Sequence, residues 1–513
     1  MSADVVKLQE MLRQALEANQ RLEQENKLLR DKLDLIIRRM WGAKSEKLDE
    51  AQMLLLLQGL DEAPKKPESP AVPALEDDGA KRKGRKSPRK PVFPANLPVE
   101  ETLIDPQEVL AEPERFRCIG SESSDRNDYH PPRFFINRIT RRKYVRVDAP
   151  HEAPLIAPLP GKIKDRHSAG PGLLAAIITG KYCDHLPLYR QEGIYMSRHG
   201  VYLPRQTMSV WMDDAADWLG LIYRHIRQGV FAGGYVQMDE IPVSFLEPGN
   251  GKTIKGYLWG CNRPGGAVFY DWSTGGRSMD RLDDLVPSDY TGRLQSDGYA
   301  VYSSHAGRHA ERIEHIFCWA HVRREFLDAA EAGCRKAAII INLISLIYAD
   351  ERGMRGARVG PALREARRSA GGLMVARRIF ALLERWSKHA FLLPASATAK
   401  AIEYTLKRRA GLERCLADGL VEIDNNLMEN SLRPIAVGRK NWLFFGSREA
   451  GQKSAVLFTI VENCRREGID PFTYLRDVFD NAGKITNRNV GDWTPAGWAR
   501  KHGQGKAAMK RGA

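Results

Sequence analysis

Apolar residues recur with the spacing of a heptad repeat through the first forty residues of the chain. One seam position holds Val5, Leu12, Asn19, Asn26, Leu33 and Met40, and the other holds Leu8, Ala15, Leu22, Leu29 and Ile36. Asparagines in such a seam pair with their counterparts and favour two strands. The pattern predicts a coiled coil over residues 1–50 that makes the chain a homodimer or a higher oligomer. An amphipathic helix packed on its own chain is the alternative.

Apolar periodicity stops after this segment, and residues 51–98 are rich in proline and charge. We expect a disordered basic linker here. Its run KRKGRKSPRKP, at 81–91, could lie along phosphates or enter a minor groove. A solvated tether is the alternative. The candidate phosphate contacts are Lys81, Arg82, Lys83, Arg85 and Lys86, followed by Arg89 and Lys90.

Residues 99–165 include the alternating stretch RFFINRITRRKYVRVD, which predicts a small β-rich module. Residues 166–230 become helical in pattern. LPLYRQEGIYMSRHG and LPRQTMSVWMDDAADWL read as two helices joined by a turn, which is typical of a helix-turn-helix. The second helix would present Arg205, Gln206, Thr207 and Ser209 to a major groove. Ordinary helix packing is the alternative.

A run of strands is predicted from residue 231 onward. GYVQMDEIPVSFL, KGYLWGCNR and AVFYDWS form a meander, a short helix follows, and GRLQSDGYAVY and EHIFCWA supply two more strands. This is the order of a ribonuclease H-like α/β core, in which the first strand is central and the fourth lies beside it. Asp239 in the first strand and Asp297 at the end of the fourth are therefore expected to meet.

The core is predicted in two parts, at 231–330 and 421–482, separated by a helical insertion at 331–420, so the chain is a multidomain α+β protein. In the second part, EIDNNLMENSLRP predicts the start of a helix capped by Asn425 or Asn426. Glu429 is then free to join the two aspartates. Glu422 and Asp424 are the next candidates if Glu429 is the wrong acid.

Three carboxylates without histidine or cysteine partners suit Mg²⁺, which prefers oxygen ligands. Two such ions about 4 Å apart activate the attacking oxygen and stabilise the leaving oxygen in phosphodiester cleavage. The expected catalytic and metal-binding residues are therefore Asp239, Asp297 and Glu429. Mn²⁺ is expected to substitute for Mg²⁺.

The chain has 513 residues, and its 79 Lys and Arg against 64 Asp and Glu give a formal charge of +15, which indicates a polyanionic partner such as DNA. Seven cysteines stand singly, so neither a disulfide framework nor a cysteine-rich zinc site is expected. The longest apolar stretch, at 337–347, is too short to span a bilayer. We expect a cytoplasmic protein with no membrane partner.

Several motifs, in order, resemble the insertion sequence 66 family of transposases: QMDE, SDGYAVY, CWAHVRREF, EIDNNLMENSLRPIAVGRKNWLFFGS and GIDPFTYLRDV. The resemblance runs from the N-terminal heptads to about residue 482. It implies an Asp-Asp-Glu core on Asp239, Asp297 and Glu429. It also implies a bacterial, nucleoid-associated enzyme that cleaves the ends of its own insertion sequence and joins the 3′ ends to target DNA. Its partners would be terminal inverted repeats, target DNA and small accessory proteins of the same element.

The module at 99–165 departs from the family pattern, which has a small zinc-binding module there. Only Cys118 and His130 remain as plausible ligands, and two ligands cannot complete a tetrahedral site. We expect a degenerate zinc-finger-like module without structural zinc. Residues 483–513 are expected to form a basic C-terminal tail.

Further DNA contacts are expected around the core. His321, Arg323 and Arg324 could approach the scissile phosphate, or could lie on a helix surface beside the fifth strand. Trp319 and Trp442 could stack on an unpaired base, or could belong to the core. The residues expected to follow the DNA strand near Glu429 are Arg433, Arg439, Lys440 and Asn441.

Two other functions remain open from the residues. One is a ribonuclease H-like nuclease or integrase acting on other DNA. The other is a DNA-binding protein with a decayed active site, against which the intact acids argue.

Deletion of residues 1–45 should convert a dimer into a monomer in dilute solution and leave the catalytic core folded, because the linker separates the two. Light scattering gives the mass, and circular dichroism monitors the fold. An unchanged mass would reject the coiled coil.

Overall fold

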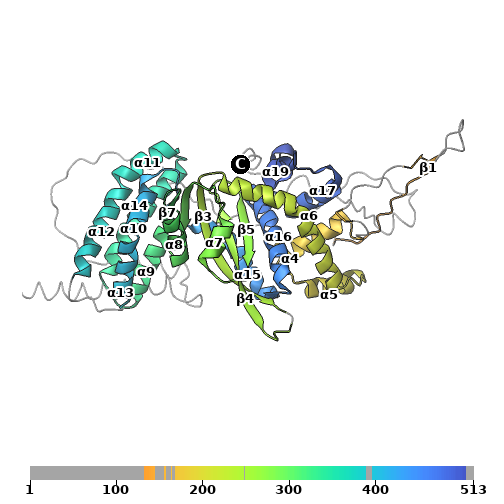
Figure 1. Ribbon diagram of the computed structural model, residues 1–513, viewed down its shortest axis with the longest axis horizontal. Coiled ribbons are helices and arrows are strands. Elements are labelled where there is room, and N and C mark those ends of the chain that lie inside the picture. The colour runs from red at the N-terminus through yellow and green to blue at the C-terminus, as the bar shows by residue number, and fades with distance from the viewer. Residues whose placement is uncertain are drawn as a thin grey trace, which may run out of the picture. The chain divides into compact units, whose positions relative to one another are not determined.

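The computed structural model describes residues 132–144, 155–156, 163–164, 168–247, 249–388 and 396–503 (Figure 1). The chain divides into two compact units, at residues 1–125 and 126–513, and every described residue belongs to the second unit. The predicted coiled coil, the basic linker, Cys118 and His130 lie outside the described residues.

A mixed six-stranded sheet lies between the helices (Figure 1). Its strands are β3 (Tyr235–Leu246), β4 (Thr253–Asn262), β5 (Val268–Ser273), β6 (Gly292–Ser296), β7 (Ile313–Phe317) and β8 (Phe444–Phe445). The order is β5-β4-β3-β6-β7, and β8 also pairs with β3. The first strand is therefore central and the fourth lies beside it, as the sequence predicted.

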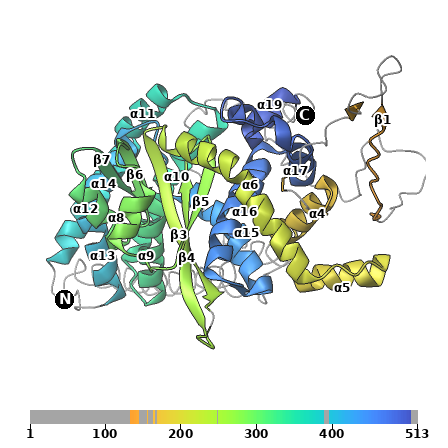
Figure 2. The same ribbon diagram turned by 45° about the vertical axis from the view of Figure 1, so that its right-hand side comes forward.

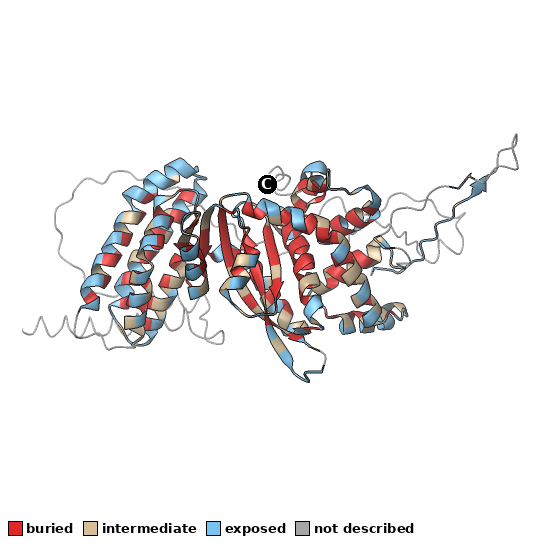
Figure 3. Cartoon of the chain, viewed as in Figure 1, coloured by how far each residue is buried: buried red, intermediate tan, exposed pale blue. Residues whose placement is uncertain are grey.

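Strand directions change at β3. It pairs antiparallel with β4, which pairs antiparallel with β5, and it pairs parallel with β6, which pairs parallel with β7. The strands of the sheet are largely buried along their length (Figure 3). Both faces of the sheet are covered because helices pack on each side.

Helix α15 (Asn426–Trp442) packs on β3 and β4, and α16 (Arg448–Glu467) packs on β5 and on α6 (Arg205–Phe231). Gly260 on β4 permits the close approach of α15, because an added Cβ would lie 2.2 Å from Met428 Cε. On the opposite face, Tyr302 of α8 (Ala300–Arg308) contacts Trp259. Figure 2 shows α8 on one side of β3 and β4, with α15 and α16 on the other. Helix α7 (Met279–Leu285) packs against α8.

The predicted helical insertion folds around a second hydrophobic core. Its helices are α10 (Ala337–Gly356), α11 (Pro361–Ala370), α12 (Gly372–Ser387), α13 (Ala397–Lys407) and α14 (Arg409–Ala417), preceded by α9 (Trp319–Glu331). Trp319 is fully buried in this core and donates a hydrogen bond from Nε1 to the Leu412 carbonyl, 3.1 Å away. Trp319 is therefore a core residue, and the prediction that it stacks on an unpaired base is wrong.

The segment predicted to be a helix-turn-helix, residues 166–230, contains α4 (Pro171–Tyr182), α5 (Leu188–His199) and all of α6 except its last residue. Gly200 ends α5 with a φ of 65°, a left-handed conformation that glycine adopts without strain. Upstream, β1 (Lys143–Tyr144) and β2 (Leu155–Ile156) form an antiparallel pair within the predicted β-rich module. The described part of the chain is thus α+β.

The segment expected to form a basic tail is folded as far as Gly503. After α17 (Pro471–Asp480) come a 3-10 turn (Ala482–Lys484), α18 (Val490–Trp493) and α19 (Pro495–Lys501). Trp493 and Trp498 are buried, and Trp498 donates from Nε1 to Asp477 Oδ2 at 2.7 Å. Two tryptophans bury enough apolar surface to dock helices that otherwise carry few apolar residues.

Replacing Trp498 with alanine should lower the free energy of unfolding by about 3–5 kcal/mol, because it removes a large buried side chain that packs on Tyr474 and bonds Asp477, both of α17. The exposed neighbour Arg500, changed to alanine, is the matched control and should shift it by less than about 0.5 kcal/mol. Denaturant unfolding measures both. Equal small effects would show that Trp498 contributes little to stability.

Candidate active site

The register of β3 and β6 places two of the predicted acids at the same edge. Gln237 on β3 pairs with Gln295 on β6, and Asp239 and Asp297 each follow two residues later. Because side chains alternate along a strand, Asp239 shares a face with Gln237. Strand β6 ends at Ser296, so Asp297 emerges beside Asp239 where the paired region stops.

Each aspartate carboxylate accepts a hydrogen bond from a backbone amide close to it in the sequence. Asp239 Oδ1 accepts from its neighbour, the Glu240 amide, at 2.8 Å, and Asp297 Oδ1 accepts from the Tyr299 amide at 2.9 Å. Glu240 points to the opposite face, where Tyr302 and Arg277 hold its carboxylate. Of the two adjacent acids in QMDE, only Asp239 therefore faces the α15 side.

Burial raises the pKa of Asp239 well above its ordinary value, and the negative charges of Glu240, Asp297 and Glu429 raise it further. Asp297 and Glu429 therefore both lie near enough to Asp239 for their charges to act on it. An ionised Asp239 is unfavourable here unless a cation offsets the repulsion.

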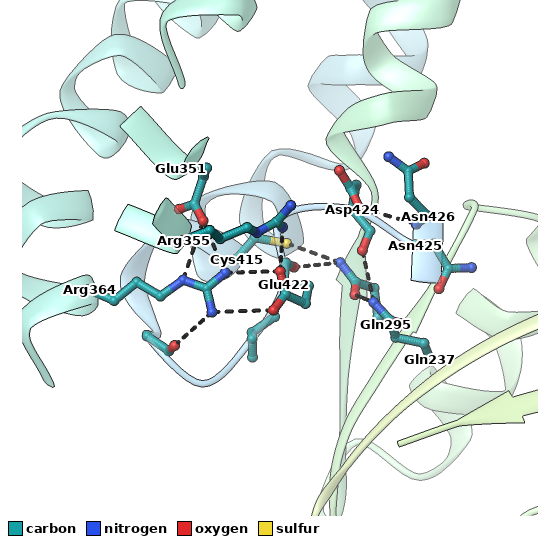
Figure 4. A network of polar contacts seen from close by, with 12 residues as sticks. Gln237, Gln295, Glu351, Arg355, Arg364, Cys415, Glu422, Asp424, Asn425 and Asn426 are labelled. Carbon is teal, nitrogen blue, oxygen red and sulfur yellow. Dashed lines mark hydrogen bonds and ion pairs between the residues drawn. The ribbon is translucent and has the colours of Figure 1, made fainter. Parts of the chain in front are cut away.

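The start of α15 is attached to the sheet by a segment at residues 422–425 (Figure 4). Gln295 Nε2 donates to the Glu422 carbonyl at 2.9 Å. Gln237 Nε2 donates to the Asp424 carbonyl at 2.8 Å. These bonds bring the first turn of α15, which carries Glu429, to the face of the sheet that also carries Asp239.

The asparagine side chains at this helix start make no cap hydrogen bond. Asn425 occupies the N-cap position without a side-chain cap bond, and its Nδ2 donates instead to the Met238 carbonyl of β3 at 2.9 Å. The Asn426 amide donates to Asp424 Oδ1 at 3.2 Å. Asn425 is thus the N-cap residue as predicted, but its side chain bonds β3 and makes no cap hydrogen bond.

Glu429 faces basic residues of α9. Its Oε1 lies 3.9 Å from His321 Nε2, and its Oε2 lies 3.9 Å from an Nη2 of Arg324. Burial lowers the pKa of His321, which favours the neutral ring. Glu429 Oε1 is buried and has no hydrogen-bond partner in the described part of the chain, so this oxygen is available to a ligand.

These residues fit a hard divalent cation. Glu429 offers a buried carboxylate oxygen, Oε1, that has no hydrogen-bond partner among the described residues and is of the kind that a hard cation binds. Cys318 also lies near Glu429 and His321, within 4.8 Å. Burial raises the pKa of its thiol to about 12, and its Sγ accepts from the Asn425 amide at 3.2 Å. Without a metal ion the Cys318 thiol is therefore protonated and used within the fold.

The two reserve candidates have other partners. Both Glu422 oxygens are bonded by Arg364. Asp424 is buried and accepts from the Asn426 amide. Neither carboxylate is as open as that of Glu429.

The predicted DNA contacts have mixed placements. Arg205, Gln206, Arg324, Arg433 and Lys440 are exposed, whereas Thr207, Ser209, Arg323 and Asn441 are half-buried. Arg439 instead donates to the Pro242 carbonyl at 2.6 Å, so at least part of this side chain is used within the fold. Trp442 stacks on Phe445, with ring centroids 5.0 Å apart. The contacts at Lys81–Lys86 lie outside the described residues.

A cluster of one aspartate and two histidines, which the sequence analysis did not predict, lies between α7 and α8. Asp283 Oδ1 is 2.6 Å from His305 Nδ1 and 3.5 Å from His309 Nε2. The pattern His-x-x-x-His was its sequence signal. Arg308 donates to the other oxygen of Asp283 at 2.6 Å, so a guanidinium already neutralises this carboxylate. The group therefore joins two helices.

Comparison with known proteins identifies the family. A family model described as Transposase IS66 family matches residues 166–453, more than half of the chain. The chain belongs to the IS66 family of transposases. The matched span includes Asp239, Asp297 and Glu429, and the resemblance stated from the motifs is confirmed. A second model, described as Transposase C of IS166 homeodomain, matches residues 28–102.

Three relatives from Sinorhizobium fredii resemble this IS66-family chain. The uncharacterized protein y4qI is 35% identical over 415 residues, covering 77% of this chain and 75% of y4qI. The uncharacterized protein y4jD is 29% identical, covering 92% and 94% of the two chains. The uncharacterized protein y4hP is 27% identical, covering 91% and 88%. Within the described residues, no helix combines the length and apolar character needed to cross a membrane.

The raised pKa of Asp239 has a consequence for stability. The folded state binds the Asp239 proton more tightly than the unfolded state, so ionisation costs stability as pH rises through the raised pKa. Asp239→Asn should therefore raise the melting temperature of the ion-free protein, by roughly 2–4 °C per kcal/mol of relieved repulsion. The gain should be larger near about pH 8 than near about pH 5.

Differential scanning calorimetry with and without Mg²⁺ measures this effect, and the exposed Asp289→Asn is the control. Added Mg²⁺ should stabilise the natural protein more than the variant. A lower melting temperature for Asp239→Asn at both pH values would contradict the repulsion.

Proposed function

We propose that this IS66-family protein is a DNA transposase that cleaves the ends of its own insertion sequence and joins the 3′ ends to target DNA. The observation that supports the proposal is that Asp239 and Asp297 follow paired residues of β3 and β6, while Glu429 on α15 lies near enough for its charge to act on Asp239. The order β5-β4-β3-β6-β7 supports a ribonuclease H-like core, with residues 331–420 inserted between its two parts.

Asp239, Asp297 and Glu429 would hold two Mg²⁺ ions, with Mn²⁺ able to substitute. When bound, these ions supply activation of the attacking hydroxyl and stabilisation of the leaving oxygen. The chain contributes rigid placement, because β3 and β6 fix the two aspartates and α15 carries Glu429. Glu429 Oε1 has no hydrogen-bond partner in the described part of the chain and would be available to such an ion.

Basic residues beside the acids would handle the phosphate. Arg324 is mostly exposed, and its guanidinium could leave Glu429 for a phosphate oxygen once metal ions neutralise the carboxylate. His321, in its neutral form, could donate a hydrogen bond to the same group. Both lie on α9, whose start adjoins the end of β7.

DNA would be held by several surfaces. The exposed start of α6, with Arg205 and Gln206, would read base edges, aided by Thr207 and Ser209. Arg323, Arg433, Lys440 and Asn441 would contact the backbone near the acids, as would the basic linker at Lys81–Lys86. The predicted coiled coil would pair two chains, and accessory proteins of the same element remain expected partners.

A nuclease or integrase that acts on other DNA is the rival within enzymes, and a decayed DNA-binding protein is the rival outside them. The three acids and their supporting bonds are intact, which disfavours decay. An assay that scores both cleavage and joining of 3′ ends separates the three functions.

Asp239→Asn, Asp297→Asn and Glu429→Gln should each reduce cleavage more than about 100-fold, since each removes a metal ligand's charge with little change in shape. DNA affinity should change little. Cleavage of a labelled duplex and its equilibrium binding measure the two effects. The exposed Asp289→Asn is the matched control and should remain active. Normal cleavage by any of the three variants would show that this acid is not a ligand.

A further inference from the structure

Glu422 is the residue at which the helical insertion meets the segment leading to α15. Its carboxylate is mostly buried, with 16% of the side chain exposed. Arg364 of α11 donates to it from both Nη atoms, at 3.3 Å to Oε1 and 2.9 Å to Oε2. Arg355 of α10 donates to Oε2 at 2.5 Å (Figure 4). Two insertion helices therefore hold one carboxylate that precedes Glu429 by seven residues.

The ion pairs around Glu422 outweigh its burial. Burial alone would raise the pKa of Glu422, but the hydrogen bonds and charges of Arg364 and Arg355 lower it below its ordinary value. Charge-assisted bidentate bonds of this kind are the strongest and most directional that side chains form. The position of Glu422 is thus tightly specified.

The arginines are themselves fixed inside the insertion. Arg364 also bonds Glu351, 3.0 Å away, and Glu351 pairs with the fully buried Arg368. The Nη1 of Arg368 donates to the carbonyls of Cys415, Asp418 and Val421. The insertion therefore bonds backbone carbonyls as far as residue 421 and the side chain of residue 422.

The other side of Glu422 is attached to the sheet. Its amide donates to Tyr235 Oη at 3.0 Å, and its carbonyl accepts from Gln295 Nε2 at 2.9 Å. Two residues later, the Asp424 carbonyl accepts from Gln237. The backbone of this segment is thus bonded to the strands that carry Asp239 and Asp297, while its side chain is bonded to the insertion.

We propose that Arg364 and Arg355 are positioning residues that set Glu429 against the two aspartates by fixing Glu422 at the entrance to α15. The proposal rests on the proposed function of Asp239, Asp297 and Glu429. The insertion is then part of the catalytic machinery, because it helps to determine where the third metal ligand lies. Arg355 is half exposed, so direct contact with DNA is the competing role for that residue.

The test measures cleavage by the full-length protein on a duplex copied from the end of the DNA element that encodes it, across a series of Mn²⁺ concentrations. Glu422→Gln and Arg364→Met should each lower the maximal rate about 10–100-fold, as loss of a supporting shell does. They should also raise the Mn²⁺ concentration for half-maximal cleavage, so that high Mn²⁺ restores part of the rate. Affinity for the duplex should stay within about twofold of that of the natural protein.

Three variants refine the test. Arg364→Lys keeps the charge but not the bidentate geometry and should fall between the natural protein and Arg364→Met. The double variant Arg364→Met with Glu422→Gln should lose little more than either single variant, since both break one interaction. Arg367→Ala, on the same helix as Arg364, breaks an exposed ion pair with Asp350 of α10 and should leave the rate and the Mn²⁺ requirement unchanged.

The outcomes are separable. The proposal is overturned if Glu422→Gln and Arg364→Lys need the same Mn²⁺ concentration as the natural protein and cleave more slowly only because less of the protein is folded. The network would then have a structural role alone. Weaker duplex binding by Arg355→Met at an unchanged Mn²⁺ requirement would assign Arg355 to DNA. If Glu422→Gln is fully active and Asp239→Asn is inactive, the positioning role is rejected and the proposed function stands. If Asp239→Asn is active, the proposed function itself is rejected.

Discussion

The candidate site depends on one buried pair of amides. Gln237 on β3 donates to Gln295 Oε1 on β6 at 2.9 Å, and each glutamine donates to a carbonyl of residues 422–425. Both side chains are fully buried, so their polar atoms must be paired within the protein. This requirement joins the two strands to the segment that begins α15. Asp239, Asp297 and Glu429 each lie within a few residues of one of these bonds.

The arrangement places function and stability in opposition. Burial and neighbouring acids raise the pKa of Asp239, so the ion-free site carries repulsion that the surrounding fold must sustain. The surrounding bonds are correspondingly strong. The glutamines bind the segment from the sheet, and Arg364 and Arg355 bind it from the insertion. A metal site built from distant parts of a chain needs such support, because a small displacement of one ligand weakens the whole site.

Much of this could be read from the sequence because alternation along strands is a local pattern. It located β3 to β7, and the order of strands then placed Asp239 beside Asp297. Tertiary bonding could not be read in the same way. Asparagine is a common helix cap, but the Asn425 side chain donates to the Met238 carbonyl. A glutamate can bind a metal ion, but the Glu422 carboxylate accepts hydrogen bonds from Arg364. The C-terminal helices were missed because they are short and dock mainly through Trp493 and Trp498.

The most direct test of the central claim is anomalous diffraction from crystals of the full-length protein soaked in Mn²⁺. If the three carboxylates form the metal site, the anomalous density will lie between Asp239, Asp297 and Glu429, about 2.0–2.3 Å from their oxygens. Density at Asp283, His305 and His309 instead, with none at the three acids, would contradict the account.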